Sequence, residues 1–204
     1  GGAGSDFDTV SAALTGLDEQ GVINRQDFIG LDDLSEFRFF SNSFSTTTTG
    51  IDIVGNTDFD FMGGESRLTV AANYNETEVD SVGTVNPISA GRVSAIEDLL
   101  PNLRANVSWS HTDGKWRTLL RANYYGGWDD TGNGVNGIGA EVLIDAEVAY
   151  QYTDQLQFVV GVDNLLDTYP QENPGAGDSG QLYSEASPFG FNGGTWYLQA
   201  RYVY

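Results

Sequence analysis

Residues 103–109 read Leu103-Arg104-Ala105-Asn106-Val107-Ser108-Trp109, with an apolar side chain at every odd position and a polar one at every even position. A period of two is the signature of a β-strand with one apolar face. Six further segments follow the same pattern, at about 37–61, 66–79, 115–127, 142–153, 156–166 and 195–204. The sequence therefore predicts an all-β fold built as an antiparallel meander of about seven strands.

Two short helices are expected, both inside connections between strands. The first begins at Asp6, a good helix cap, and ends at Gly16. The second runs from about Val93 to Leu100 and ends before Pro101. Neither is long enough to form part of a core, so the fold class stays all-β.

The connections alternate between short and long. Tight turns are predicted at 62–65, 111–114 and 153–155, and long Gly-, Asn- and Asp-rich connections at 1–36, 80–101, 128–141 and 167–194. A meander with this alternation places every tight turn at one end and every long loop at the other. Transmembrane barrels of the outer membrane have this asymmetry, whereas a soluble sandwich has loops at both ends.

The placement of charge on the strands favours a membrane-spanning wall. An Arg on a lipid-facing position costs about 2–4 kcal/mol at the bilayer midplane. All five arginines of the predicted strands fall on the polar face: Arg67, Arg104, Arg117, Arg121 and Arg201. Aromatic residues lie near the strand ends, as in the two aromatic girdles of a barrel. A half-buried soluble sheet would show the same alternation, so this alternative stays open.

Composition excludes several classes of function. Nine Lys and Arg against 29 Asp and Glu give a net charge of −20, which argues against a nucleic-acid partner. The chain has no Cys, and its single His, His111, falls in a predicted tight turn without a nucleophile or metal partner. The segment from Asp129 to Gly134 resembles a calcium loop, but Ala140 stands where that loop needs its last acid, so a Gly-rich hairpin loop is favoured. We expect no enzyme activity and no cofactor.

Seven strands cannot close a barrel of this kind. Single-chain bacterial barrels have even strand numbers from eight upward, and an open edge in hydrocarbon leaves backbone groups unsatisfied. Either an eighth strand lies near the start or the chain is the C-terminal portion of a larger wall. Residues 1–36 offer no convincing strand, which favours the second option.

Four segments resemble TonB-dependent outer-membrane receptors. Residues 161–170, Gly-Val-Asp-Asn-Leu-Leu-Asp-Thr-Tyr-Pro, resemble that family's penultimate strand and its exit into the last extracellular loop. Residues 48–52 and 68–78 resemble two motifs upstream of it, and residues 196–204 resemble the terminal strand with its closing aromatic residue. The four occur in the family's order and at its spacing.

The resemblance implies a 22-stranded barrel in the outer membrane of a Gram-negative bacterium, of which residues 37–204 would form the C-terminal strands and residues 1–36 an extracellular loop region with a possible short helix. It implies uptake of a scarce nutrient, such as a metal chelate, cobalamin or an oligosaccharide. The implied partners are the receptor's own plug and N-terminal strands, the energising TonB complex, outer-membrane lipid and lipopolysaccharide, and the assembly machinery. Tyr202 and Tyr204 would belong to the terminal strand that this machinery reads.

Ligand-binding candidates lie in the loops and on the polar face. Aromatic rings among amides and carboxylates suit the stacking of sugars or peptides, and the loop candidates are Trp128, Tyr169, Tyr183, Phe189 and Phe191. Packing of the loops against one another is the alternative for these residues. Arg104, Arg117 and Arg121 could line a solute path or pair with Asp145, Glu147 or plug residues.

Two other hypotheses stay open from the sequence. One is a self-contained small outer-membrane barrel with a structural or adhesive role, which needs an eighth strand within residues 1–36. The other is a soluble acidic β-domain that binds carbohydrate. A soluble domain would bury Leu103, Val107, Leu120 and Val148 between two layers, so the structure can separate it from a barrel wall.

Overall fold

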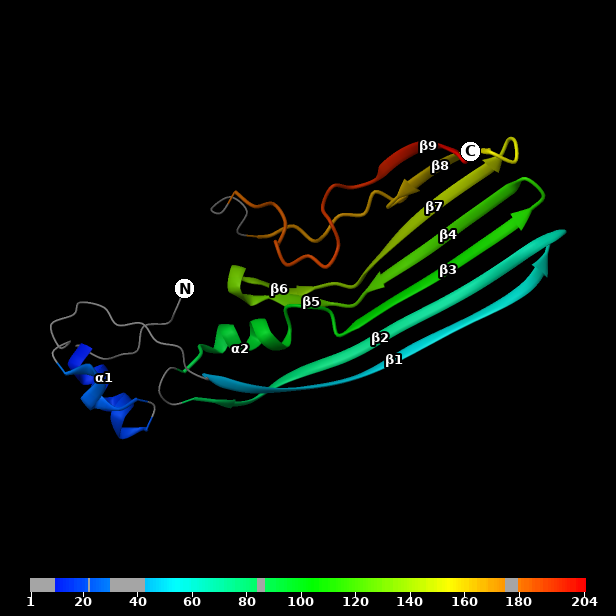
Figure 1. Cartoon of the computed structure of the whole chain (residues 1–204). Coiled ribbons are helices and arrows are strands. Elements are labelled where there is room, and N and C mark those ends of the chain that lie inside the picture. Colours follow the sequence, from blue (N-terminus) through cyan, green and yellow to red (C-terminus); the bar gives the residue numbers. More distant parts are fainter. Residues whose placement is uncertain (1–9, 22, 30–42, 84–86, 175–179) are drawn as a thin grey trace.

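Seven antiparallel strands form a single curved sheet in the computed structural model, which describes residues 10–21, 23–29, 43–83, 87–174 and 180–204 (Figure 1). The spatial order is β1-β2-β3-β4-β7-β8-β9, so each strand lies beside the next strand of the sheet in the chain. The bounds are β1 Phe44–Phe61, β2 Gly64–Val82, β3 Leu103–Asp113, β4 Trp116–Tyr125, β7 Glu141–Gln151, β8 Leu156–Asp163 and β9 Thr195–Tyr202. The predicted meander is confirmed; the predicted start of its first strand, at 37–42, lies outside the described residues.

The tight turns and the long connections lie at opposite ends of the sheet (Figure 1). The long-loop end carries the helix α2 (Ala90–Glu97) and a separate hairpin of β5 (Trp128–Asp130) and β6 (Val135–Ile138), joined by the 3-10 turn η2 (Thr131–Asn133). The predicted asymmetry and the hairpin within 128–141 are therefore confirmed.

His111 does not lie in a turn, contrary to the prediction. Strand β3 continues to Asp113, and the chain reverses at Gly114, whose φ of 54° suits a glycine. His111 pairs in the ladder with Ser66 and Thr118. Its Nδ1 lies 2.9 Å from the Ser66 hydroxyl and its ring stacks on Trp109 at 5.6 Å. A cross-strand partner and an aromatic neighbour thus hold this residue in the strand.

The helices differ from their predicted limits. Helix α1 (Val10–Glu19) continues past Gly16, where it was expected to end. A mid-helix glycine costs about 1 kcal/mol, and the completely buried Leu14 and Leu17 on either side of it offset that cost. The predicted cap, Asp6, lies outside the described residues. A 3-10 helix, η1, follows at Arg25–Phe28.

Helix α2 is shorter at its C-terminal end than predicted. The Ser89 hydroxyl caps it by accepting a hydrogen bond from the Arg92 amide, and it ends at Glu97, before Leu99 and Leu100. None of the helices in the described ranges has the length and the apolar character that crossing a bilayer requires.

One face of the sheet is apolar and open to the surroundings. The ladder aligns apolar side chains across strands, as in the row Val70, Val107, Ala122 and Ile144. The four residues that a soluble sandwich would bury are 39% to 42% exposed: Leu103, Val107, Leu120 and Val148. A soluble sandwich buries such a face against a second sheet, and the described residues include no sheet that covers it, which favours the barrel wall over the soluble two-layer alternative. The described sheet is an antiparallel transmembrane wall.

Aromatic rings gather where the apolar face meets the tight turns. Trp116 packs against Tyr150 with ring centroids 4.5 Å apart, and Phe61 meets Trp109 edge-on at 6.1 Å. Tyr152 and Phe158 continue the belt at 6.2 Å. Amphipathic rings favour the bilayer interface, so this belt marks one boundary of the membrane-spanning band.

The first two strands are longer than a bilayer requires. β1 has 18 residues and β2 has 19, whereas a tilted strand crosses the hydrocarbon core in about 9–11. Because their tight turn at Met62 and Gly63 lies beside the aromatic belt, the excess length projects at the long-loop end. Glu76 and Glu78, which lie on the same side of β2 as its apolar residues, belong to this projecting part.

A glycine on β8 makes room for an aromatic residue of β9. The ring of Tyr197 crosses the backbone of Gly161, and a Cβ built on Gly161 would lie 2.2 Å from Cζ of that ring. This close approach lets the Tyr197 hydroxyl reach past β8 and donate to Glu147 on β7, at 2.9 Å. Three strands are thereby tied together on the polar face.

Gly161→Ala tests this packing. The new methyl group cannot occupy the same space as the Tyr197 ring, so we expect a loss of about 1–3 kcal/mol in the free energy of unfolding, typical of overpacking. Gly55→Ala is the matched control, because no atom lies within 4 Å of a Cβ built on this strand glycine. Urea unfolding of the complete barrel in lipid vesicles measures both variants; equal stability of the two would contradict the packing.

Candidate functional site

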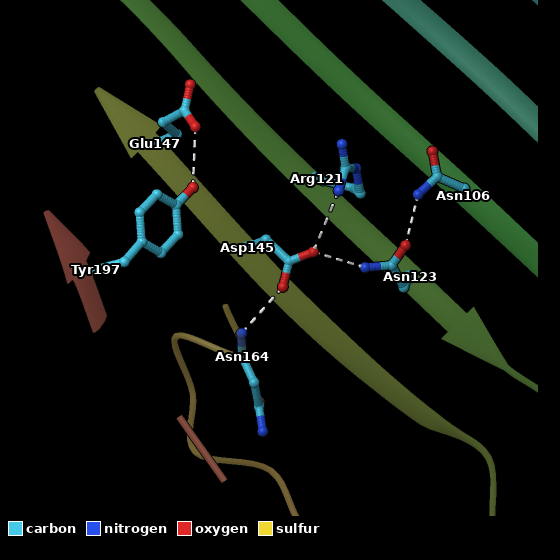
Figure 2. Close-up of polar contacts among 7 residues, drawn as sticks. All are labelled: Asn106, Arg121, Asn123, Asp145, Glu147, Asn164 and Tyr197. Carbon is cyan, nitrogen blue, oxygen red and sulfur yellow. Dashed lines mark hydrogen bonds and ion pairs between the residues drawn. The ribbon is translucent and has the colours of Figure 1, made fainter. Parts of the chain in front are cut away.

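Asp145 is the centre of a polar network on the inner face of the sheet (Figure 2). Its Oδ2 accepts a hydrogen bond from Asn123 Nδ2 at 2.9 Å and lies 3.8 Å from a guanidinium nitrogen of Arg121. Its Oδ1 accepts from the backbone amide of Asn164 at 3.0 Å. Asn123 in turn accepts from Asn106 at 2.5 Å. One carboxylate thus joins β3, β4, β7 and the end of β8.

A second group on the same face joins β4, β7 and β9. Arg117 donates to Glu147 Oε1 at 2.7 Å, and Tyr197 donates to Glu147 Oε2 at 2.9 Å (Figure 2). Two of the three candidate arginines, Arg117 and Arg121, therefore pair with carboxylates of β7, which was one of the two options left open by the sequence. Both guanidinium groups remain nearly half exposed, so each pair adds less than about 1 kcal/mol.

Arg104 lies on the same face but has a different environment. It lines a groove of about 630 Å³ together with Asp52, Asn73, Asn106 and Tyr125. In the part of the chain that the structure describes, the Arg104 guanidinium makes neither an ion pair nor a hydrogen bond. Pro188, from the last long connection, borders the groove at its loop end.

The motif after β8 acts as a clamp on the last long connection. Asn164 has a φ of 55°, and its side chain donates to the Thr168 carbonyl at 2.7 Å and accepts from the Thr168 amide at 2.9 Å. Asp167, with a φ of 54°, accepts from the Gly194 amide at 2.8 Å, just before β9. Asn and Asp tolerate this left-handed backbone better than most residues. The two ends of the connection are thus held together.

Tyr169 completes this clamp. Its hydroxyl contacts the Asp167 carboxylate, whose negative charge and hydrogen bond raise the pKa of the Tyr169 phenol above its ordinary value. A Cβ built on Gly193 would lie 2.2 Å from that hydroxyl, so glycine is needed there. Asn164, Asp167, Thr168 and Tyr169 all belong to the segment that resembles the receptor family, so this motif has a structural role in holding the last connection.

The long connections pack into one cap at the loop end of the sheet. The hydroxyls of Ser94 on α2 and Thr131 on η2 lie 2.7 Å apart, and the Asp129 amide donates to the Asp98 carbonyl at 2.8 Å. In the last connection, the Ser184 hydroxyl donates to the Asp130 carboxylate, and both residues are buried. We refer to α2, β5, η2, β6 and residues 180–192 as the cap.

The five loop aromatics predicted as ligand residues fall into two groups. Trp128 is 5% exposed in a small core with Val135 and Ile138, and Phe189 is 8% exposed against Tyr125, with ring centroids 5.2 Å apart. Trp128 and Phe189 therefore pack inside the cap, which is the alternative to ligand binding that the sequence left open. The other three form a stack in which Tyr183 lies between Tyr169, at 5.9 Å, and Phe191, at 6.1 Å.

The outer rings of this stack face solvent. Tyr169 is 40% exposed and Phe191 51% exposed. At the C-terminus, Tyr202 ends β9 and Tyr204 lies beyond it, both exposed on the apolar parity of the strand. Their role in barrel assembly stays a prediction.

The amides of the inner face were not singled out as site residues from the sequence. Asn106, Asn123 and Asn164 all have the parity or position of polar residues, but their connection through Asp145 depends on the register between four strands. The register places Asn106 opposite Asn123 and Arg121 opposite Asp145. The sequence alternation could indicate that these residues lie on the inner face. Which of them contact one another follows only from the pairing of the strands.

Comparison with known proteins identifies the family. Residues 22–165 match the family described as "TonB dependent receptor-like, beta-barrel", which is more than half of the chain. The chain therefore belongs to the TonB-dependent receptor β-barrel family, as its motifs predicted, and this family resides in the outer membrane of Gram-negative bacteria. No curated protein matches the chain.

Among solved structures, the chain is similar to one named "Copper transporter OprC". The identity is 12% and the TM-score 0.42, over 80% of this chain and 30% of the other. The chain thus spans less than a third of that protein's length.

Asn164→Ala tests the clamp. Alanine loses both hydrogen bonds to Thr168 and is disfavoured at positive φ, so we expect the last connection to open more often. Chymotrypsin, which cuts beside Tyr183 and Phe189, should then cleave the variant at least several times faster than the parent protein in membranes. Asp163→Ala, one residue earlier on β8, serves as the control and should leave cleavage unchanged. Identical cleavage of Asn164→Ala and the parent protein would contradict the clamp.

Proposed function

We propose that this chain forms the C-terminal part of a TonB-dependent transporter that binds a scarce nutrient through its extracellular cap and imports it through a plugged barrel. The observation that carries the proposal is the division of the wall into an apolar outer face and a hydrogen-bonded polar inner face, with the cap at one end only. A solute entering at that end meets the aromatic stack first and the polar inner wall next.

The open edges of the sheet support the need for further strands. Within the described residues, β1 and β9 each have a neighbour on one side only. In a bilayer the backbone groups of the other side require partners, since unsatisfied groups in hydrocarbon cost several kcal/mol each. We propose that N-terminal strands of the same receptor pair with both edges to give a 22-stranded barrel around a plug.

The remaining partners follow from the same proposal. The apolar face and the aromatic belt would contact outer-membrane lipid, with lipopolysaccharide around the projecting parts of β1 and β2. The plug would be moved by the energising TonB complex of the inner membrane. Assembly machinery would recognise β9, with Tyr202 and Tyr204, during insertion into the membrane.

The proposed uptake depends on the cap, so replacing part of it tests the function. In the complete receptor, we would replace residues 180–191 with a short Gly-Ser linker; Asn164 and Asp167 remain in place, so the barrel should still assemble. We expect a loss of nutrient uptake of at least tenfold, comparable to that of a strain without the receptor. Depletion of metal chelates, cobalamin and oligosaccharides from a defined medium measures uptake, with and without a functional TonB complex.

The control inserts the same linker into the tight turn at Met62–Gly63, at the opposite end of the wall. This variant should take up nutrient at the parent rate. If the strain without the receptor depletes the medium as fast as the parent strain, or if uptake does not depend on TonB, the proposed function is wrong.

A further inference from the structure

Two of the five arginines of the inner wall, Arg104 and Arg201, have no carboxylate partner among the described residues, and of these two Arg104 is the one at the long-loop end. Arg67, Arg117 and Arg121 each lie within 4 Å of a carboxylate, with distances of 2.6, 2.7 and 3.8 Å. The chain has 29 acids against nine Lys and Arg, so acid partners are plentiful for an arginine of the wall, yet Arg104 has none among the described residues. Arg104 is also half-buried rather than extended into solvent.

The position of Arg104 places it where a solute enters the wall. In the strand register it lies opposite Asn73 on β2 and Tyr125 on β4, at the end where the long connections leave the sheet. Phe189 of the cap packs on Tyr125, and Pro188 beside it borders the groove. The groove, at about 630 Å³, has the size of an ordinary small-molecule site.

The other polar groups of the groove already have partners but keep donor capacity. The Asp52 carboxylate accepts from Asn73 at 2.6 Å, and Asn106 donates to Asn123 at 2.5 Å. Each Asn side chain has two N–H groups, so these amides retain a second proton for a ligand hydroxyl or carboxylate. Among the described residues that line the groove, Asp52 is the single carboxylate and Arg104 the single cation.

We propose that this groove binds an anionic, hydroxyl-rich ligand, with Arg104 taking its carboxylate group and the amides of Asn73 and Asn106 taking its hydroxyl groups. The inference rests on the proposed transport function and adds a substrate class to it. An arginine recognises a carboxylate through two parallel N–H···O bonds. Two sources supply this chemistry, a sugar acid within an oligosaccharide and a small free hydroxycarboxylate.

Direct binding to the purified complete receptor tests the proposal. The probes are trigalacturonate, citrate, and galactotriose as the neutral counterpart of trigalacturonate, each measured by isothermal titration calorimetry. We expect the parent receptor to bind at least one of the two anionic probes about tenfold or more tightly than galactotriose, because charge-assisted hydrogen bonds are roughly twice as strong as neutral ones. Preference for trigalacturonate identifies the sugar acid, and preference for citrate the free hydroxycarboxylate.

Arg104→Gln should remove that preference, and Arg104→Lys should restore part of it, because lysine keeps the charge without the planar fork. Arg67→Gln is the matched control: it removes the same charge from the inner face at the tight-turn end, and the preference should stay at the parent value. Heat-dependent migration in gels verifies that each variant has assembled its barrel.

Three results would overturn the inference: failure of both anionic probes to bind, equal binding by the parent receptor and Arg104→Gln, or an equal loss of anionic and neutral binding in Arg104→Gln. The last result would show that Arg104 holds the plug instead of the ligand. Failure of the proposed transport function is detected separately, since uptake by cells would then not depend on the receptor whatever the purified protein binds.

Discussion

The exclusion of unpaired polar groups from hydrocarbon is the constraint on which this structure depends. It requires that each strand hydrogen-bond to its neighbours and that every charge within the spanning band lie on one face. The alternation along β3 meets both conditions: Leu103 and Val107 point to the apolar side while Arg104 and Asn106 point to the polar side. The open edges at β1 and β9 are the places where the described sheet does not yet meet the constraint, and they point to the rest of the barrel.

The polar inner face is more than a solvated surface. Asp145 and Glu147 lie two residues apart on β7, and each collects donors from neighbouring strands, including Arg121, Arg117 and Tyr197. Asp145 also holds the Asn164 amide at the start of the clamp. The same strand that stabilises the wall therefore positions the last connection, and through it the cap and its aromatic stack.

The sequence predicted the parts of the fold that depend on local periodicity. Strand identity, the parity of each face, and the division between tight turns and long connections all follow from alternation and from Gly-rich segments, and the structure agrees with them. His111 was misplaced because its neighbours Thr112, Asp113 and Gly114 have turn-forming composition, whereas pairing with Ser66 and stacking on Trp109 keep it in the strand. The predicted end of helix α1 at Gly16 was wrong because burial of Leu14 and Leu17 outweighs the low helix propensity of glycine.

The candidate site was less accessible from the sequence, since its contacts join residues far apart in the chain. The division of the loop aromatics is an example: Trp128 and Phe189 are buried, while Tyr169 and Phe191 are exposed, and nothing local to these residues distinguishes them. Likewise, Arg104 differs from Arg117 and Arg121 only through the register, which places an acid across from Arg121 and Tyr125 across from Arg104.

Site-directed spin labelling along β3 can determine which side of the wall meets lipid and which meets water. The chain has no cysteine, so single-cysteine variants at each position from Leu103 to Trp109 can be labelled in the complete receptor in lipid bilayers. We expect oxygen, which concentrates in hydrocarbon, to relax labels at odd positions, and a water-soluble nickel chelate to relax labels at even positions. Equal accessibility at all seven positions, or the opposite phase, would contradict a wall with lipid on one side and water on the other.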